Sequence, residues 1–285
     1  MKRPLRIIVL ILFLIVTLPI ELEVLLYLLD PWGLKYFDDL AILWENVVSD
    51  PDRGYMLPAG TYKFSHWTAT IDEGSVRAVP GNQHGSCKVL FIGDSVTWGH
   101  GVDDADTWIS RIAEQMPQID AINAALDGYN SENVRRGIAD FPDAKVIVYF
   151  VIGNDAEPTS GWDYGLPQQP HLSMIEKYIR YLQLNAQINA PAPKSETAQQ
   201  DPNYIRFKND LQALADDGRV IFFAPKDVFE ASIVSQYDIH ELTADPKNPD
   251  RISAADPHPN PNGHRRVAAF ILPFVQSAAA KACPQ

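Results

Sequence analysis

The sequence predicts an α/β fold in which a parallel sheet is covered on both faces by helices. Short apolar segments, typical of buried strands, alternate with longer segments whose apolar residues recur at helical spacing. This alternation favours parallel strands, because each helix returns the chain to the same end of the sheet. The 285 residues are 46% hydrophobic, enough for one sizeable core. No repeat of about 20 to 50 residues is visible, which argues against solenoids and propellers.

The first element is an N-terminal apolar segment. Basic residues among the first six positions precede the uninterrupted apolar run 7–20, and apolar residues resume as far as Leu29. Together they make about 25 residues, enough to span a bilayer, and no small-x-small cleavage site follows. We therefore expect a signal anchor in residues 1–30 with its basic end in the cytoplasm and the remaining chain outside it. A cleaved signal peptide is the alternative, and in either case the functional domain is exported.

Residues 31–86 are expected to form a juxtamembrane helix and a linker. Residues 34–48 carry apolar side chains at helical spacing with acids between them, which predicts an amphipathic helix on the membrane or on the domain. Residues 51–85 are rich in Pro, Gly and Ser, with short β-prone pieces, and we expect a linker that partly packs on the domain.

Residues 87–285 form the predicted α/β domain. Strands are predicted at 89–92, 121–123, 146–152 and 220–224, and helices at 107–115, 131–140, 173–189, 204–216 and 262–280. Residues 156–172 and 190–202 are expected to be inserted loops.

The turn after the first predicted strand carries a candidate nucleophile. The strand 88–92 turns at Gly93 and Asp94 toward a helical segment, which places Ser95 at the carboxyl end of a strand. In open α/β sheets sites are built on that edge, and a following helix N-terminus directs free N–H groups toward an anion formed nearby. An ordinary glycine turn with a capping serine is the alternative.

Three further blocks follow predicted strands or precede the last helix. Gly128 lies in a loop where backbone N–H can approach a ligand closely, and Asn154 follows the strongest strand with an amide donor. His258 could act as a base for a serine hydroxyl, and Asp256 could orient its ring. Each block alone is common in turns, but the four together, in this order, indicate acyl chemistry on a serine.

In these blocks the sequence resembles the SGNH hydrolases, also called the GDSL family, over roughly residues 88–281. The motifs are GDSVTWG, GND and DPHPNPNGH, and less closely NAALDGYN. The resemblance implies Ser95 as nucleophile, His258 as base, and an oxyanion hole from the Ser95 and Gly128 backbones and the Asn154 side chain. It also implies a five-stranded, flavodoxin-like parallel sheet in a three-layer α/β/α sandwich.

One departure concerns the acid. The common family pattern has it three residues before the histidine, where this chain has Ala255, whereas Asp256 is two residues before His258. In an extended segment, side chains two apart point the same way, so we expect Asp256 to orient the imidazole. Another acid or a backbone carbonyl is the alternative. A similar spacing occurs in related membrane-associated polysaccharide O-acetyltransferases.

Composition and motifs lead to a function. The formal net charge of -12 and isoelectric point near 4.9 argue against nucleic acid as a partner. No cofactor or metal is expected, since the remaining histidines lack reliable ligand spacing: His66, His84, His100, His171, His240 and His264. We expect a membrane-anchored, extracytoplasmic serine esterase that acts on O-acyl groups such as acetyl esters of a cell-surface glycan. An O-acyltransferase on cell-surface polysaccharide and a non-catalytic anchored binding or assembly subunit are the alternatives, and the oligomeric state is left open.

The two cysteines, Cys87 and Cys283, test the same geometry. If Ser95 meets His258, the last helix must run back along the first strand, which brings both thiols toward one edge of the sheet. Export to an oxidising compartment would let them pair. The helix, about 30 Å long at 1.5 Å per residue, is longer than the strand, so two unpaired thiols are the alternative.

Overall fold

A central eight-stranded sheet organises the protein. The computed structural model describes residues 3–157, 170–188, 201–243 and 250–284, and its sheet has the order β10-β9-β8-β6-β7-β5-β4-β3. The five strands from β10 to β7 are parallel: β6 (Cys87–Gly93), β7 (Ile119–Asn123), β8 (Val146–Phe150), β9 (Val220–Pro225) and β10 (His240–Leu242). The first parallel strand lies between the second and the third, which is the flavodoxin-like order. The predicted fold class is confirmed.

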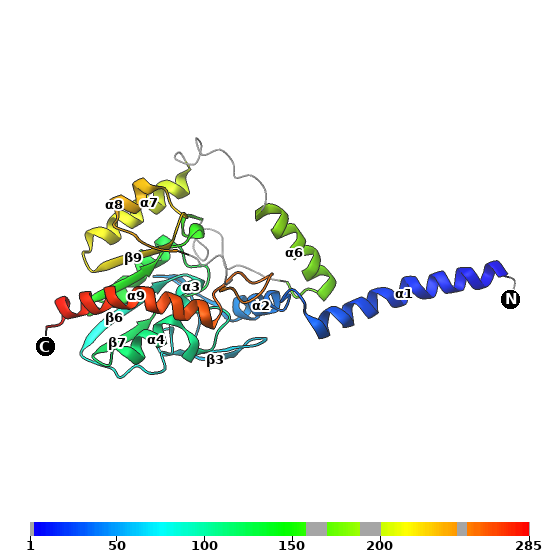
Figure 1. Ribbon diagram of the computed structural model, residues 1–285, viewed down its shortest axis with the longest axis horizontal. Helices are drawn as coiled ribbons and strands as arrows, with labels where there is room; N and C mark the ends of the chain where they lie inside the picture. Colours follow the sequence, from blue (N-terminus) through cyan, green and yellow to red (C-terminus); the bar gives the residue numbers. More distant parts are fainter. Residues whose placement is uncertain (1–2, 158–169, 189–200, 244–249, 285) are drawn as a thin grey trace.

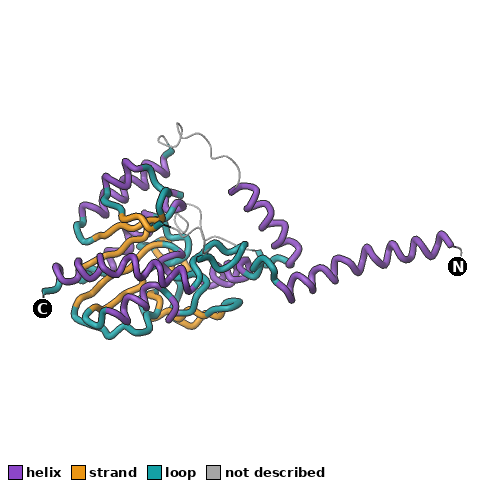
Figure 2. Tube along the Cα trace, in the orientation of Figure 1, coloured by secondary structure: helices purple, strands orange, loops and turns teal. Residues whose placement is uncertain are grey.

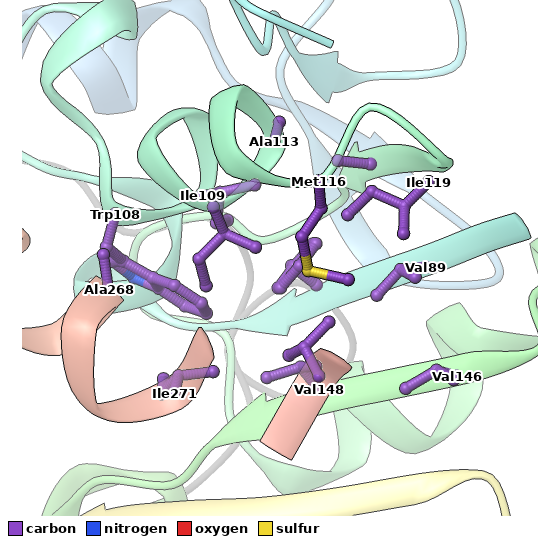
Figure 3. Packing of buried hydrophobic residues seen from close by; sticks show 14 of the residues in the cluster. Val89, Trp108, Ile109, Ala113, Met116, Ile119, Val146, Val148, Ala268 and Ile271 are labelled. Atoms are coloured by element: carbon purple, nitrogen blue, oxygen red, sulfur yellow. The ribbon is translucent and has the colours of Figure 1, made fainter. Parts of the chain in front are cut away.

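Helices cover both faces of this sheet, as Figures 1 and 2 show. On one face, α4 (Trp108–Gln115) and α9 (Pro261–Ala282) pack on β6 and β8; Figure 3 shows Trp108 of α4 beside Ala268 of α9, and Ile271 of α9 near Val148 of β8. On the other face lie α5 (Ser131–Gly137) and α7 (Pro202–Asp216). The central strands β6 and β8 are buried on both sides, which explains why their sequences read as continuous apolar runs.

The segment expected to be a linker instead extends the sheet. Three antiparallel strands, β3 (Gly60–Lys63), β4 (Thr68–Asp72) and β5 (Val76–Arg77), join the edge of β7, and β1 (Val48–Asp50) pairs with β2 (Gly54–Met56). The sheet therefore crosses residue 86, where the sequence suggested a boundary. Arg77, 1% exposed, ion-pairs with Asp104 and donates to the Trp98 and Gly99 carbonyls, which ties this meander to the end of α3 (Ser95–Trp98) and the loop after it. Pro- and Gly-rich turns between very short strands resemble a linker in sequence.

Three helices lie at the N-terminal end of the domain. By length and composition α1 (Arg3–Leu29) could cross a membrane, and its apolar side chains are largely exposed where it leaves the domain in Figure 1. The predicted amphipathic helix is α2 (Tyr36–Asn46), whose buried Phe37 and Leu43 place it on the domain. Beside the base of α1 lies α6 (Met174–Ile188).

Two short elements were not predicted, and two predicted loops cannot be compared. Within the α/β domain, these two elements are strand β10 and helix α8 (Ala231–Gln236), three and six residues long and too short for a clear periodic pattern. Most of the predicted loops 156–172 and 190–202 lies outside the described residues.

The two cysteines, whose pairing the sequence left open, are bonded to each other. Cys87 opens β6 and Cys283 follows α9, and the two are disulfide-bonded with a Cα–Cα distance of 5.8 Å. The return of α9 along β6 is what brings the two ends of the domain together.

Removing this bridge should cost substantial stability. The bond closes a loop with a sequence separation of 196, so the double variant Cys87→Ala/Cys283→Ala should lose roughly 2–5 kcal/mol of unfolding free energy. Urea denaturation of both proteins measures the difference. Thiol titration of the unfolded, non-reduced wild type is the control, and two free thiols would refute the bridge.

Candidate active site

The Gly-Asp-Ser turn places Ser95 at the carboxyl end of β6, as the first residue of α3 (Ser95–Trp98). A Cβ at Gly93 would lie 2.6 Å from Thr97 Oγ1, so the turn requires glycine there. The Asp94 carboxylate caps α3 by accepting from the Val96 N–H at 3.0 Å. Local sequence thus produces a sharp strand-to-helix turn with the serine at its corner.

The structure brings Ser95, His258 and Asp256 together. His258 Nε2 lies 2.8 Å from Ser95 Oγ, and His258 Nδ1 lies 2.7 Å from Asp256 Oδ1. An ionised carboxylate only accepts, so Nδ1 carries the proton and Nε2 is free to accept the serine proton. Asp256 can reach the His258 ring from only two residues away because the segment forms a turn. Asp256 Oδ1 also accepts from the His258 backbone N–H at 3.0 Å, and the Asp256 N–H donates to Ser253 Oγ.

The predicted oxyanion-hole residues follow adjacent strands. Gly128 lies in the loop after β7, and Asn154 lies in the short 3-10 helix Gly153–Ala156 after β8. Because β6 lies between β7 and β8, these residues and Ser95 share one edge of the sheet. Gly128 and Asn154 are both exposed residues. Their role as donors remains a prediction.

The Asp94 carboxylate competes for the serine proton. Ser95 Oγ lies 2.9 Å from Asp94 Oδ2, almost as close as it lies to His258 Nε2. Burial raises the pKa of Asp94 to about 7. The single hydroxyl proton can be donated to only one of these acceptors at a time. A protonated Asp94 no longer competes for it, and leaves it to His258.

A second histidine-aspartate pair adjoins the base and was missed from sequence. The fully buried His100 stacks on His258 with ring centroids 4.4 Å apart, and its Nδ1 lies 2.5 Å from Asp127 Oδ2. Burial is the largest single influence and opposes the charged ring, but the charge and hydrogen bond of Asp127, together with the charges of Asp256 and Asp39, outweigh it and raise the pKa of His100. The ring centroid of Tyr36 in α2 lies 5.4 Å from that of His100 and 5.9 Å from that of His258. His100 directly follows the motif GDSVTWG and Asp127 stands in NAALDGYN, but only the fold shows that the two loops meet.

Three side chains at this site lie close enough together to be candidate metal ligands. Ligand atoms of His100, Asp256 and His258 lie within 4.8 Å of one another. The two imidazole rings, however, are stacked at an interplanar angle of 28°, and ring lone pairs lie in the ring planes, so they do not converge on one ion. Asp256 and His258 already bond each other. The cluster suits proton transfer better than metal binding.

His264, in the first turn of α9, should make the fold sensitive to acid. It is fully buried, and burial, followed by the charges of Arg77 and Arg111, lowers its pKa to about 3. Below an ordinary histidine pKa of about 6.5, the unfolded chain binds a proton at His264 that the folded protein does not bind. The free energy of unfolding therefore keeps its full value above that pH and falls as the pH drops toward 3.

His264→Gln should therefore lose less unfolding free energy than the wild type between pH 7 and pH 4, by on the order of 3 kcal/mol. Urea denaturation at a series of pH values measures both proteins. Parallel pH dependences would contradict a neutral buried His264.

Structural comparison finds many solved relatives of low identity. A lipolytic protein of the G-D-S-L family from Desulfitobacterium hafniense is 19% identical with a TM-score of 0.39, and the match covers 66% of this chain and 99% of that chain. A psychrotrophic esterase from a Pseudoalteromonas species is 12% identical with a TM-score of 0.38, and the match covers 69% of this chain and 96% of that chain. A carbohydrate acetylesterase family member from Sinorhizobium meliloti is 16% identical with a TM-score of 0.35, covering 68% and 99%. No curated protein matches the sequence.

The family comparison is more direct. A model of the GDSL-like lipase/acylhydrolase family matches residues 91–266, more than half of the chain. The matched range begins in β6 just before Ser95 and ends in α9 just after His258. The resemblance noted in the motifs is thus confirmed over the α/β domain, and the chain belongs to the GDSL-like lipase/acylhydrolase family, whose members hydrolyse carboxylic esters.

Proposed function

We propose that this protein is a serine esterase that hydrolyses O-acyl esters through an acyl-enzyme on Ser95. The observation that carries the proposal is the unbroken chain from Asp256 Oδ1 to His258 Nδ1 at 2.7 Å and from His258 Nε2 to Ser95 Oγ at 2.8 Å. A serine hydroxyl is a poor nucleophile until an oriented imidazole takes its proton, and this arrangement supplies both the base and its orienting acid.

The geometry supports a two-step reaction. His258 accepts the Ser95 proton as Oγ attacks the ester carbonyl, and the backbones of Ser95 and Gly128 with the Asn154 amide donate to the oxyanion. His258 then returns the proton to the departing alcohol, which leaves an acyl group on Ser95. Water then attacks the acyl carbonyl while His258 takes its proton, and His258 returns that proton to Ser95 Oγ as the acyl–Oγ bond breaks, which releases the acid and restores the serine. Asp256 stabilises the imidazolium that forms in each step.

The proposal includes an uncleaved membrane anchor. Leu26 in α1 is 5% exposed and packs with Leu34 and Phe37. The Glu23 carboxylate accepts the backbone N–H groups of Met174 and Ile175. A leader removed by cleavage would take these contacts with it, so they favour retention of α1.

An extracytoplasmic location is part of the same proposal. The basic residues at the start of the chain favour a cytoplasmic N-terminus with the domain on the other side. The Cys87–Cys283 bridge suits an oxidising compartment.

O-acetyl groups of a cell-surface glycan are the proposed substrates. A cavity of about 540 Å³ borders the triad at Asp256, though not at Ser95 or His258, and Trp32, Tyr36 and Trp67 line it. Aromatic walls combined with a few polar groups orient small ligands, and they offer flat faces to sugar rings.

Hydrolysis of p-nitrophenyl acetate and of acetylated oligosaccharides by the full-length protein in detergent tests the proposal. Release of acetate to water is expected. Inertness of the folded protein toward every ester would overturn the proposal and favour a non-catalytic subunit. Preferential transfer to an added sugar would favour the O-acyltransferase alternative.

A further inference from the structure

We propose that α6 lies on the membrane surface, with an apolar stripe of Ile175, Ile179 and Leu182 against the lipid, and thereby holds the active site at the bilayer. This inference rests on the anchoring of α1 proposed above. It concerns an element that neither the reaction nor the anchor itself requires.

One face of α6 is packed and a neighbouring stripe is uncovered. The stripe residues are spaced i, i+4 and i+7, so they lie within about 60° around the helix. Ile175 packs beside the buried Leu26 of α1, whereas Ile179 and Leu182 are 49% and 47% exposed. The stripe therefore begins at the base of α1 and continues outward, where none of the described residues covers it. Beside it, Gln183 and Glu176 are exposed polar residues.

The start of α6 is fixed at a particular height along α1. A hydrocarbon core about 30 Å thick needs about 20 residues at 1.5 Å each, which, counted from Ile7 after the basic residues, reaches Leu26, less than one helical turn beyond Glu23. The Glu23 carboxylate accepts the N–H groups of Met174 at 2.5 Å and Ile175 at 3.0 Å. The first turn of α6 is thus pinned where the hydrocarbon core ends, the level at which amphipathic helices lie in membranes.

Aromatic side chains gather at the same level. Trp32, which follows α1, contacts Tyr178 and Tyr181 of α6 with ring centroids 4.6 and 6.4 Å apart. The Lys35 ammonium lies 4.9 Å from the ring centre of Tyr27 in the last turns of α1. Trp and Tyr are enriched where membrane meets water, because one end of each ring is apolar and the other polar.

The bilayer is the occupant favoured over a protein partner because the stripe continues an apolar surface that is already open on α1. Val24 and Leu28, beyond Glu23, are 51% and 71% exposed. No new partner is needed to cover these side chains and the stripe together, since the membrane that receives α1 already lies there. Lipid contact along α6 would remove both from water at once.

The consequence is a catalytic centre close to the membrane. Leu28 and Leu29 at the end of α1 line the same cavity as Tyr36 and Asp256. In Figure 1, α1, α2 and α6 lie at one end of the molecule, and the end of α9 lies at the other. The esters within reach are therefore those presented at the membrane surface, such as acylated glycans still attached to it.

A site-specific probe tests lipid contact. Cys87 and Cys283 are bonded to each other, so Leu182→Cys in the full chain provides one free thiol for an environment-sensitive fluorophore. In phosphatidylcholine vesicles, brominated acyl chains should remove about half of its fluorescence, because an interfacial helix inserts its apolar face to about 5–10 Å. Gln183→Cys, about 100° further around α6, is the matched control and should be quenched much less.

The outcomes separate the inference from the proposals beneath it. A Leu182→Cys label that is quenched by aqueous iodide but not by brominated lipid, in protein that floats with the vesicles, overturns the inference alone. A label shielded from both quenchers indicates a protein partner and also overturns it. Protein that fails to float with vesicles refutes the anchor, and with it the lipid contact. Hydrolysis of p-nitrophenyl acetate by the same variant reports separately on the esterase.

Discussion

Ser95→Ala is expected to abolish ester hydrolysis, with a loss in kcat on the order of 10⁶, as for removal of the nucleophile from a serine protease. Within the described part of the chain, the Ser95 hydroxyl is the one proton donor at His258 Nε2, 2.8 Å away. Without Oγ no acyl-enzyme can form, and the oxyanion donors can assist only direct attack by water. Turnover of p-nitrophenyl acetate measures the loss.

The fold of Ser95→Ala should survive, because the turn depends on other atoms. Asp94 still caps α3 through the Val96 N–H, and β6 is untouched. Ser110→Ala is a matched control, since it removes another fully buried serine hydroxyl, one that bonds the Asp104 carbonyl. It should retain turnover. A folded Ser95→Ala protein with undiminished turnover would end the proposed mechanism.

Asp256→Asn is expected to lower turnover by a factor on the order of 10⁴, as in a serine protease triad. The amide has no charge to stabilise the imidazolium that forms when His258 takes the serine proton. It can also present N–H to Nδ1, which leaves the proton on Nε2 and removes the acceptor that faces Ser95. The loss should fall on kcat more than on KM, because Asp256 touches the base and not the nucleophile.

Asp127→Asn provides a matched control for that experiment. It alters a second carboxylate bonded to a buried histidine, His100, which stacks on His258 without bonding Ser95. Its effect on turnover should be clearly smaller. If Asp256→Asn lost less than about tenfold, another acid or a backbone carbonyl would have to orient His258.

The strands and the nucleophile turn could be read from the sequence because their causes are local. Strands β6 and β8 are buried on both faces and therefore appear as uninterrupted apolar segments. The turn at Gly93 requires a residue without a side chain and a capping carboxylate, and both stand next to Ser95. The linker was misread for the opposite reason: β3, β4 and β5 are stabilised by pairing with one another and with β7, not by their own composition.

By itself, then, the sequence determined the alternation of elements, the GDSL motifs and the residues expected to react, because periodicity, turn chemistry and motif spacing are properties of short segments. Only the tertiary structure decided which side chains touch. Ser95 and His258 are 163 residues apart, and the stacking of His100 on His258 joins two loops that no local pattern relates. The same holds for α6. Its amphipathic pattern is visible in the sequence, but its position along α1 is set by the contact of its first turn with Glu23. Contacts of this kind depend on the path of the whole chain, since the free energy that secures them comes from burying surfaces contributed by distant segments.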